Sequence, residues 1–250
     1  MSKHSSHRLW EIDVIRFFAL SLMLVQHITI IWIYVLNYQL GEYPQYINLI
    51  GRIGALLFLF LVGFSGFLSY KKRQFSEEFS DFSRHFFLRG IAIFGWGMLL
   101  TLATFFVVPE QPIWFGVLHF IGIAVITLPF FIKYKFFSRV FILISIIIGV
   151  LAINILPLNF WFLPLGFVPT GLSSLDYWPY FPWISVVIAG LEVARYLIDE
   201  KNLSKLLFSR NMPSSLKLIQ RLGSHTLLIY LVHVPIFAVI FWVIRHYFNI

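Results

Sequence analysis

The chain contains no cysteine, and only 12% of its 250 residues are charged. Without cysteine there is no disulfide framework, no thiol nucleophile and no thiolate metal site. Soluble domains carry about 25% charged residues, whereas 59% of this chain is hydrophobic. We therefore expect an integral membrane protein.

The sequence also lacks the patterns of several other protein classes. It has no alternating strand pattern and no glycine-rich phosphate loop after a strand. A zinc site needs three or four converging ligands, and no pair of histidines stands four residues apart on one helix, so no metal site is expected. Matching broken helices in two halves, which many transporters show, are absent as well.

Continuous apolar runs of about 20 residues are typical of membrane-spanning helices rather than barrel strands. They predict an all-α, polytopic helical bundle that forms a single domain over residues 1–250. The seven expected spans are 14–36, 51–70, 88–108, 114–132, 138–157, 179–198 and 224–246.

Basic residues predict the orientation of these spans. Of the 19 Lys and Arg residues, only Arg52 and Arg245 fall on the second side, so 17 gather on the side of the N-terminus. The positive-inside rule then places the N-terminus in the cytoplasm and the C-terminus outside. The net charge of +8 therefore reflects topology and contact with lipid headgroups, not nucleic acid. The chain is expected to be a multi-pass protein of the cell membrane.

The segment between Pro157 and Pro182 is rich in aromatic residues, Pro and Gly, and Asp176 is its only charge. Proline every few residues excludes a regular spanning helix, and aromatic side chains favour the membrane–water interface. Two interpretations stay open: an interfacial loop, or a lid over an outward-facing site that includes Asp176.

Arg16 and His27 stand eleven positions apart in the first apolar run. On a helix this spacing puts both on nearly one face, about 16 Å apart along the axis. Arg16 then lies near one membrane surface and His27 near the middle of the bilayer. A titratable residue at that depth indicates a functional site, although a polar contact between packed helices would also explain it.

Three other polar residues lie within the spans. His119 is flanked by Gly116 and Gly122, which would let a helix or a ligand approach closely, and both a functional and a structural role stay open for it. A structural role is favoured for His233 and for Glu192, which is three residues before Arg195 and within reach of a helical ion pair.

The opening helix resembles that of membrane acyltransferases, in which an arginine, ten residues and a histidine occur at this place. The chain is most similar to the heparan-alpha-glucosaminide N-acetyltransferase catalytic-domain family, related to the acyltransferase-3 family. Four stretches carry the resemblance: Glu11–His27, Phe58–Ser69, Trp114–Ala124 and Asp176–Trp183. Phe17 departs from the family, which usually has glycine after the arginine.

The resemblance implies transfer of an acyl group, usually acetyl, from cytoplasmic acyl-CoA to a hydroxyl or amine presented outside, with a glycan among the candidate acceptors. It implies His27 and Arg16 as catalytic residues, with acyl-CoA as a donor substrate and no bound cofactor. The substrate-binding candidates are Asp13, Arg84, Arg89, His119 and Asp176. Guanidinium groups suit the phosphates of CoA, and a neutral imidazole can take the proton of the attacking nucleophile.

Two other classes stay open at this point. One is a transporter for a small solute with His27 and His119 as polar lining, and the other is a non-catalytic membrane scaffold.

Overall fold

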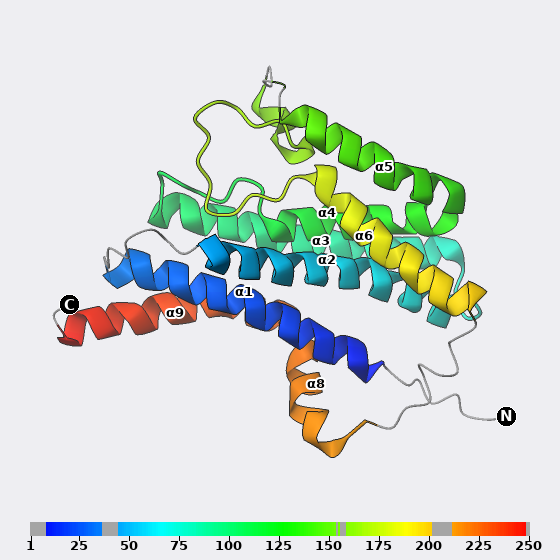
Figure 1. The fold of residues 1–250 in the computed structure, drawn as a ribbon, viewed down its shortest axis with the longest axis horizontal. Coiled ribbons are helices and arrows are strands. Elements are labelled where there is room, and N and C mark those ends of the chain that lie inside the picture. The colour runs from blue at the N-terminus through cyan, green and yellow to red at the C-terminus, as the bar shows by residue number, and fades with distance from the viewer. Residues whose placement is uncertain (1–8, 37–44, 154, 156–158, 202–211, 249–250) are drawn as a thin grey trace. The chain divides into compact units, whose positions relative to one another are not determined.

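The structure is a computed structural model and describes residues 9–36, 45–153, 155, 159–201 and 212–248. The described residues form helices and their connections, with one isolated β-bridge between Phe115 and Tyr177 and no strand. The all-α prediction is therefore confirmed. In chain order (Figure 1), the main helices are α1 (Trp10–Leu36), α2 (Gln45–Arg73), α3 (Phe79–Val107), α4 (Val117–Lys133), α5 (Lys135–Ala152), α6 (Tyr180–Arg195), α8 (Lys217–Ser224) and α9 (Thr226–Phe248).

Five of these helices are long and apolar enough to cross a membrane: α1, α2, α3, α5 and α6 with its continuation to Asp199. Helix α4 has 17 residues and is shorter than these five, whereas the apolar helix α9 has 23 residues. All seven expected spans correspond to a helix in the same order. The number of helices that cross the bilayer remains a prediction for α4 and α9, as does the orientation.

The contacts divide the chain into two compact units, one of residues 1–58 and 202–250 and the other of residues 59–201. In the first unit, α1 runs antiparallel to the beginning of α2, since Gly51 of α2 abuts Gln26 of α1 whereas Gly54 abuts Ala19. Helix α9 runs beside α1 in the same direction (Figure 1). The short helix α8 packs on the start of α1, where Gly223 lies against the backbone carbonyl of Asp13.

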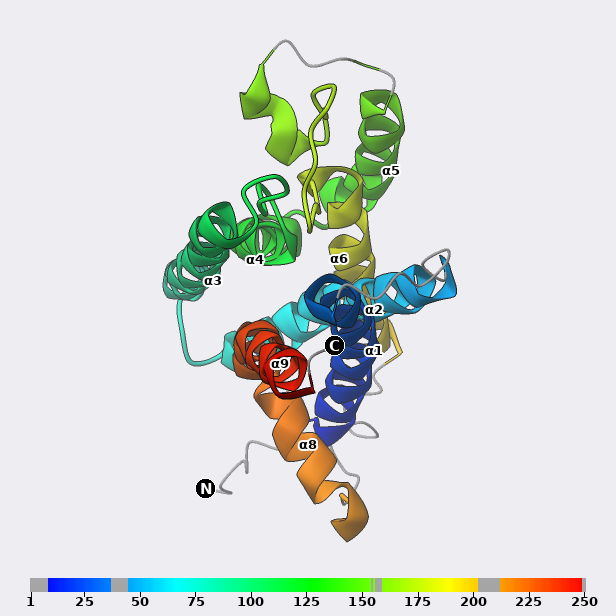
Figure 2. The same cartoon turned by 90° about the vertical axis from the view of Figure 1, so that its left-hand side faces the viewer.

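In the second unit, α4 is buried on nearly every side, and its core includes Phe120, Ala124 and Leu128. It packs beside α3, and α5 packs beside α6 (Figure 2). The contacts within each pair run in opposite directions along the two helices, so both pairs are antiparallel. A helix that is apolar all round belongs inside a bundle. Helix α3 instead exposes large apolar side chains such as Leu99 and Leu102, which suits contact with lipid.

Two glycines of this unit allow backbones to touch. A Cβ at Gly63 of α2 would meet the backbone carbonyl of Val187 in α6, and a Cβ at Gly190 would meet that of Phe60. Small residues at such positions let membrane helices approach closely. Helices α2 and α6 run in the same direction, since Gly63 lies against Leu191 and Lys71 contacts Asp199 further along both, as expected for the second and sixth spans.

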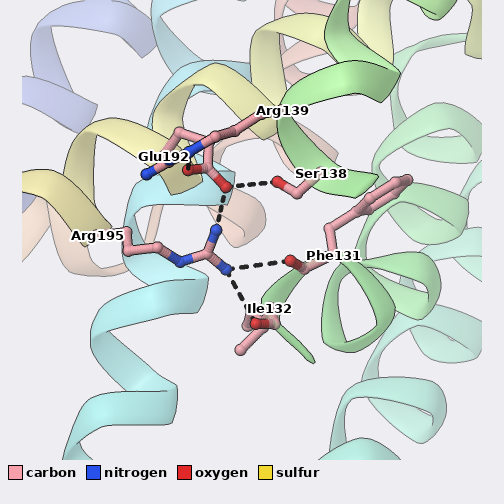
Figure 3. A network of polar contacts seen from close by, with 6 residues as sticks. All are labelled: Phe131, Ile132, Ser138, Arg139, Glu192 and Arg195. Atoms are coloured by element: carbon pink, nitrogen blue, oxygen red, sulfur yellow. Dashed lines mark hydrogen bonds and ion pairs between the residues drawn. The ribbon is translucent and has the colours of Figure 1, made fainter. Parts of the chain in front are cut away.

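A buried polar network ties together the ends of α4, α5 and α6 (Figure 3). Glu192 and Arg195 form the expected ion pair, which confirms its structural interpretation. Ser138 donates to Glu192 at 2.5 Å and Arg139 pairs with it at 3.1 Å. Arg195 also donates to the carbonyl oxygens of Phe131 and Ile132 at 3.1 and 2.9 Å, so it satisfies acceptors that the last turn of α4 leaves open.

The proline-rich segment after α5 contains a 3₁₀ turn over Phe160–Leu165 and is otherwise irregular where described. The absence of a regular spanning helix there, as expected, follows from its prolines. Helix α5 ends at Ala152, and the expected end of the fifth span at residue 157 lies outside the described residues.

Candidate active site

The first end of α1 holds Asp13 and Arg16 together. Arg16 Nη1 lies 2.9 Å from Asp13 Oδ1, and the Asp13 carboxylate is almost fully buried. Its second oxygen accepts a hydrogen bond of 3.0 Å from Gln220 of α8. Asp13 therefore orients Arg16 and anchors α8 to α1, whereas a direct role of Asp13 in substrate binding remains a prediction.

His27 lies further along the same helix, about 16 Å from Arg16 by helix rise. Its Nδ1 is 2.8 Å from Nε2 of His233 on α9, and His233 Nδ1 is 2.5 Å from the carbonyl oxygen of Tyr230. His233 is buried and His27 is partly exposed. Within the described chain, no group hydrogen-bonds to His27 Nε2, so this nitrogen is available to a reactant.

His119 stands in the first turn of α4, in the second unit, and is fully enclosed. Its Nδ1 accepts from the backbone N–H of Gly116 at 3.2 Å, and Nε2 lies 3.3 Å from Thr101 Oγ1. The Thr101 hydroxyl donates to the carbonyl of Ile113 at 2.5 Å, so it accepts from the His119 ring. Both ring nitrogens are thus occupied, and these contacts account for His119 as a brace between α3 and α4. A role of His119 in substrate binding stays a prediction.

Asp176 caps the same end of α4. Its Oδ2 accepts from the backbone N–H of Val117 at 2.8 Å, beside Gly116, where a Cβ would meet the carboxylate. Burial raises the pKa of Asp176 to about 6, against the opposing effect of hydrogen bonds from Val117 and Trp178. A carboxylate at a helix N-terminus satisfies an open N–H and favours the helix dipole. Asp176 thereby fixes the irregular segment to α4, which fits an anchored interfacial loop.

Arg84 and Arg89 lie on exposed positions of α3. Among the described residues, neither forms a hydrogen bond or an ion pair, and Arg73 at the end of α2 is close enough to act on Arg89 electrostatically. Lys71 of the same helix pairs with Asp199 at 2.7 Å. This end of the second unit is therefore cationic and has guanidinium groups free to bind an anion.

The structure thus joins Asp13 with Arg16 in one unit, and His119 with Asp176 in the other. The contact between His27 and His233 could not be predicted from the sequence, because the two residues are 206 positions apart. Each residue alone was visible as an imidazole within an apolar run. Within the part of the chain described, no three His, Asp or Glu side chains converge in a way that could hold a metal ion.

Comparison with known proteins gives one match. No curated protein and no solved structure matches the chain. Residues 8–235 match the family described as heparan-alpha-glucosaminide N-acetyltransferase, catalytic, and the matched range includes Asp13, Arg16 and His27 as well as His233. This match confirms, over most of the chain, the resemblance to the family that the short motifs indicate. The chain therefore belongs to the heparan-alpha-glucosaminide N-acetyltransferase catalytic family of membrane acetyltransferases.

Proposed function

We propose that the protein transfers an acetyl group from cytoplasmic acetyl-CoA to a hydroxyl or amine on the other side of the membrane, with His27 as the general base. The observation that carries the proposal is the family match over residues 8–235. An amino sugar is the acceptor class that the name of the family suggests. Nε2 of His27, on the same helix as Arg16, provides a proton acceptor of the kind that such a reaction needs.

The distribution of charge in the second unit supports the orientation. Its Lys and Arg residues all lie toward the ends of helices that meet at the connections after α2, α4 and α6: Lys71, Lys72, Arg73, Arg84, Arg89, Lys133, Lys135, Arg139, Arg195 and Lys201. The connections at 108–116 and 153–179 contain none. By the positive-inside rule, the cationic end faces the cytoplasm, where acetyl-CoA is found.

Cationic side chains at the cytoplasmic ends of the helices suit binding of the donor substrate, acetyl-CoA. The phosphates of CoA carry several negative charges, and guanidinium groups bind phosphate in a bidentate manner. Arg84 and Arg89 of the second unit are the proposed contacts, and Arg16 is a separate candidate in the first unit. Asp13 holds Arg16 in one orientation through its 2.9 Å ion pair, so that less side-chain entropy is lost when the phosphate binds.

His27 provides the proton transfer. As the acceptor oxygen or nitrogen attacks the thioester carbonyl, His27 Nε2 takes its proton, and a C–O or C–N bond forms. The C–S bond then breaks, and the leaving thiolate takes up a proton to give free CoA. In a covalent alternative, His27 Nε2 attacks the thioester carbonyl, the C–S bond breaks and CoA leaves as the thiolate, which takes up a proton. The acceptor then attacks the acetyl-histidine, the bond between the acetyl carbon and Nε2 breaks, and Nε2 takes the proton of the acceptor.

Binding and turnover can be tested separately on purified protein in detergent. We expect acetyl-labelled acetyl-CoA to bind, and label to move to glucosamine as a probe acceptor. Arg16→Ala and Arg89→Ala should each weaken acetyl-CoA binding by about tenfold or more, the scale of one lost charge-assisted contact. Lys72→Ala, which removes a neighbouring exposed charge, is the control. Equal effects of all three variants would show diffuse surface charge instead of a donor site.

A further inference from the structure

Two consecutive hydrogen bonds determine where the proton of His27 sits. The carbonyl oxygen of Tyr230 can only accept, so the proton of neutral His233 is on Nδ1, 2.5 Å away. His233 Nε2 then carries a lone pair. It can only accept, so at 2.8 Å the hydrogen between the two rings belongs to Nδ1 of His27. The remaining nitrogen of His27, Nε2, is therefore left with its lone pair free.

The two imidazoles meet edge to edge. Their planes are 14° from parallel and their centroids are 4.9 Å apart, whereas the bonded nitrogens are 2.8 Å apart. The hydrogen bond thus lies along the line between the centroids, with both rings close to its plane. Aromatic neighbours restrict rotation: the Tyr230 ring lies 6.0 Å from His27 and the Phe237 ring lies 6.1 Å from His233, each edge-on.

We propose that His233 is a positioning residue that fixes the tautomer and the orientation of the base His27. This inference rests on the proposed function and extends it to α9, whose His233 is expected from the sequence to have a structural role. With Nδ1–H held by His233, Nε2 of His27 is the proton acceptor in every turnover. When Nε2 takes the proton of the acceptor substrate, the hydrogen bond to His233 becomes charge-assisted and stabilises the imidazolium.

A helix–helix contact alone would use the same hydrogen bond but would predict different consequences. It requires only that α1 and α9 pack, so an apolar side chain of similar size at position 233 would serve equally well. A positioning role requires an acceptor atom at the place of His233 Nε2. The amide oxygen of glutamine reaches about that far and can accept from His27 Nδ1–H.

The experiment compares His233→Leu with His233→Gln, and uses His85→Leu on the exposed face of α3 as the matched control. With acetyl-CoA and glucosamine, His233→Leu should lower kcat by about 10- to 100-fold, the range for residues that orient a functional histidine through a hydrogen bond to its other ring nitrogen. KM for acetyl-CoA should stay unchanged, because the donor contacts are untouched. His233→Gln should recover most of kcat, and His85→Leu should equal the unaltered protein.

Nitrogen NMR of histidine-labelled protein gives a readout that does not depend on turnover. The unaltered protein and His233→Gln should show His27 protonated on Nδ1, and His233→Leu should lose this preference. Protonation on Nε2 in the unaltered protein would overturn the inference, as would an unchanged kcat in folded His233→Leu. Failure of the proposed function looks different: the tautomer is as described, yet the unaltered protein transfers no acetyl group or His27→Ala transfers it at the full rate.

Discussion

Replacing Arg195 by methionine should destabilise the protein by about 3 kcal/mol, because it strands a buried carboxylate. The Arg195 side chain is 3% exposed and its partner Glu192 is 13% exposed. Breaking a buried pair by removing one partner costs ~3–5 kcal/mol. We expect the lower end of this range, because Ser138 and Arg139 still bind Glu192. The carbonyls of Phe131 and Ile132 also lose their donor, which adds to the cost.

Arg139→Met is the matched control, since it removes the same functional group from the same carboxylate. The Arg139 side chain is 52% exposed, and surface ion pairs contribute only ~0–1 kcal/mol. Thermal unfolding in detergent, followed by tryptophan fluorescence, should therefore show a much larger loss for Arg195→Met. Glu192→Gln combined with Arg195→Met should be less destabilised than Arg195→Met alone, because no buried charge is left and the remaining charge of Arg139 is exposed. Equal losses for the two arginine variants would refute the reasoning.

Three further predictions concern packing, pH and topology. Gly63→Ala should destabilise by roughly 1–3 kcal/mol through a clash with α6, whereas Gly95→Ala, which meets open space, should be neutral or stabilising; similar melting temperatures would contradict this. Because the folded pKa of Asp176 is raised to about 6, its burial favours the protonated form, so stability relative to Asp176→Asn should fall as pH rises from about 4 to about 6. A parallel pH dependence of melting in the two proteins would exclude this. An impermeant thiol reagent on intact cells should label Ser173→Cys but not Ser76→Cys, both exposed positions; the opposite pattern would reverse the orientation.

The sequence was informative about helices because bilayer depth sets their apolar length. Each expected span corresponds to a helix, but the ends differ where polar residues extend the helix beyond the hydrocarbon. Helix α3, for example, begins at Phe79 rather than 88, since Asp81 and Arg84 continue it into the polar region. Hydropathy reports the depth of a residue in the bilayer, whereas backbone hydrogen bonds continue beyond that depth.

Helix α8 was missed for a related reason. It has only eight residues, with Leu218 and Leu222 one turn apart and Lys217 and Arg221 beside them. This amphipathic pattern is visible in the sequence but too short to stand out from a basic connection. Its position depends on a tertiary contact, the hydrogen bond from Gln220 to Asp13.

Side-chain partners from distant segments were the least predictable part of the site. The interval between Arg16 and His27 follows from helix periodicity, and the pair of Asp13 with Arg16 from a spacing of three residues. The contact of His27 with His233 and the cap of α4 by Asp176 depend on which helices and loops are neighbours. A single sequence gives no register between such segments.

The most direct test of the account measures acetyl transfer by His27→Ala in protein that still folds and still binds acetyl-CoA. Loss of a general base typically lowers the rate by ~10²–10⁴, so transfer to glucosamine should fall by at least this factor. Melting temperature and acetyl-CoA affinity should stay close to those of the unaltered protein. Full transfer by His27→Ala together with loss in His119→Ala would contradict the account, because the base would then lie on α4.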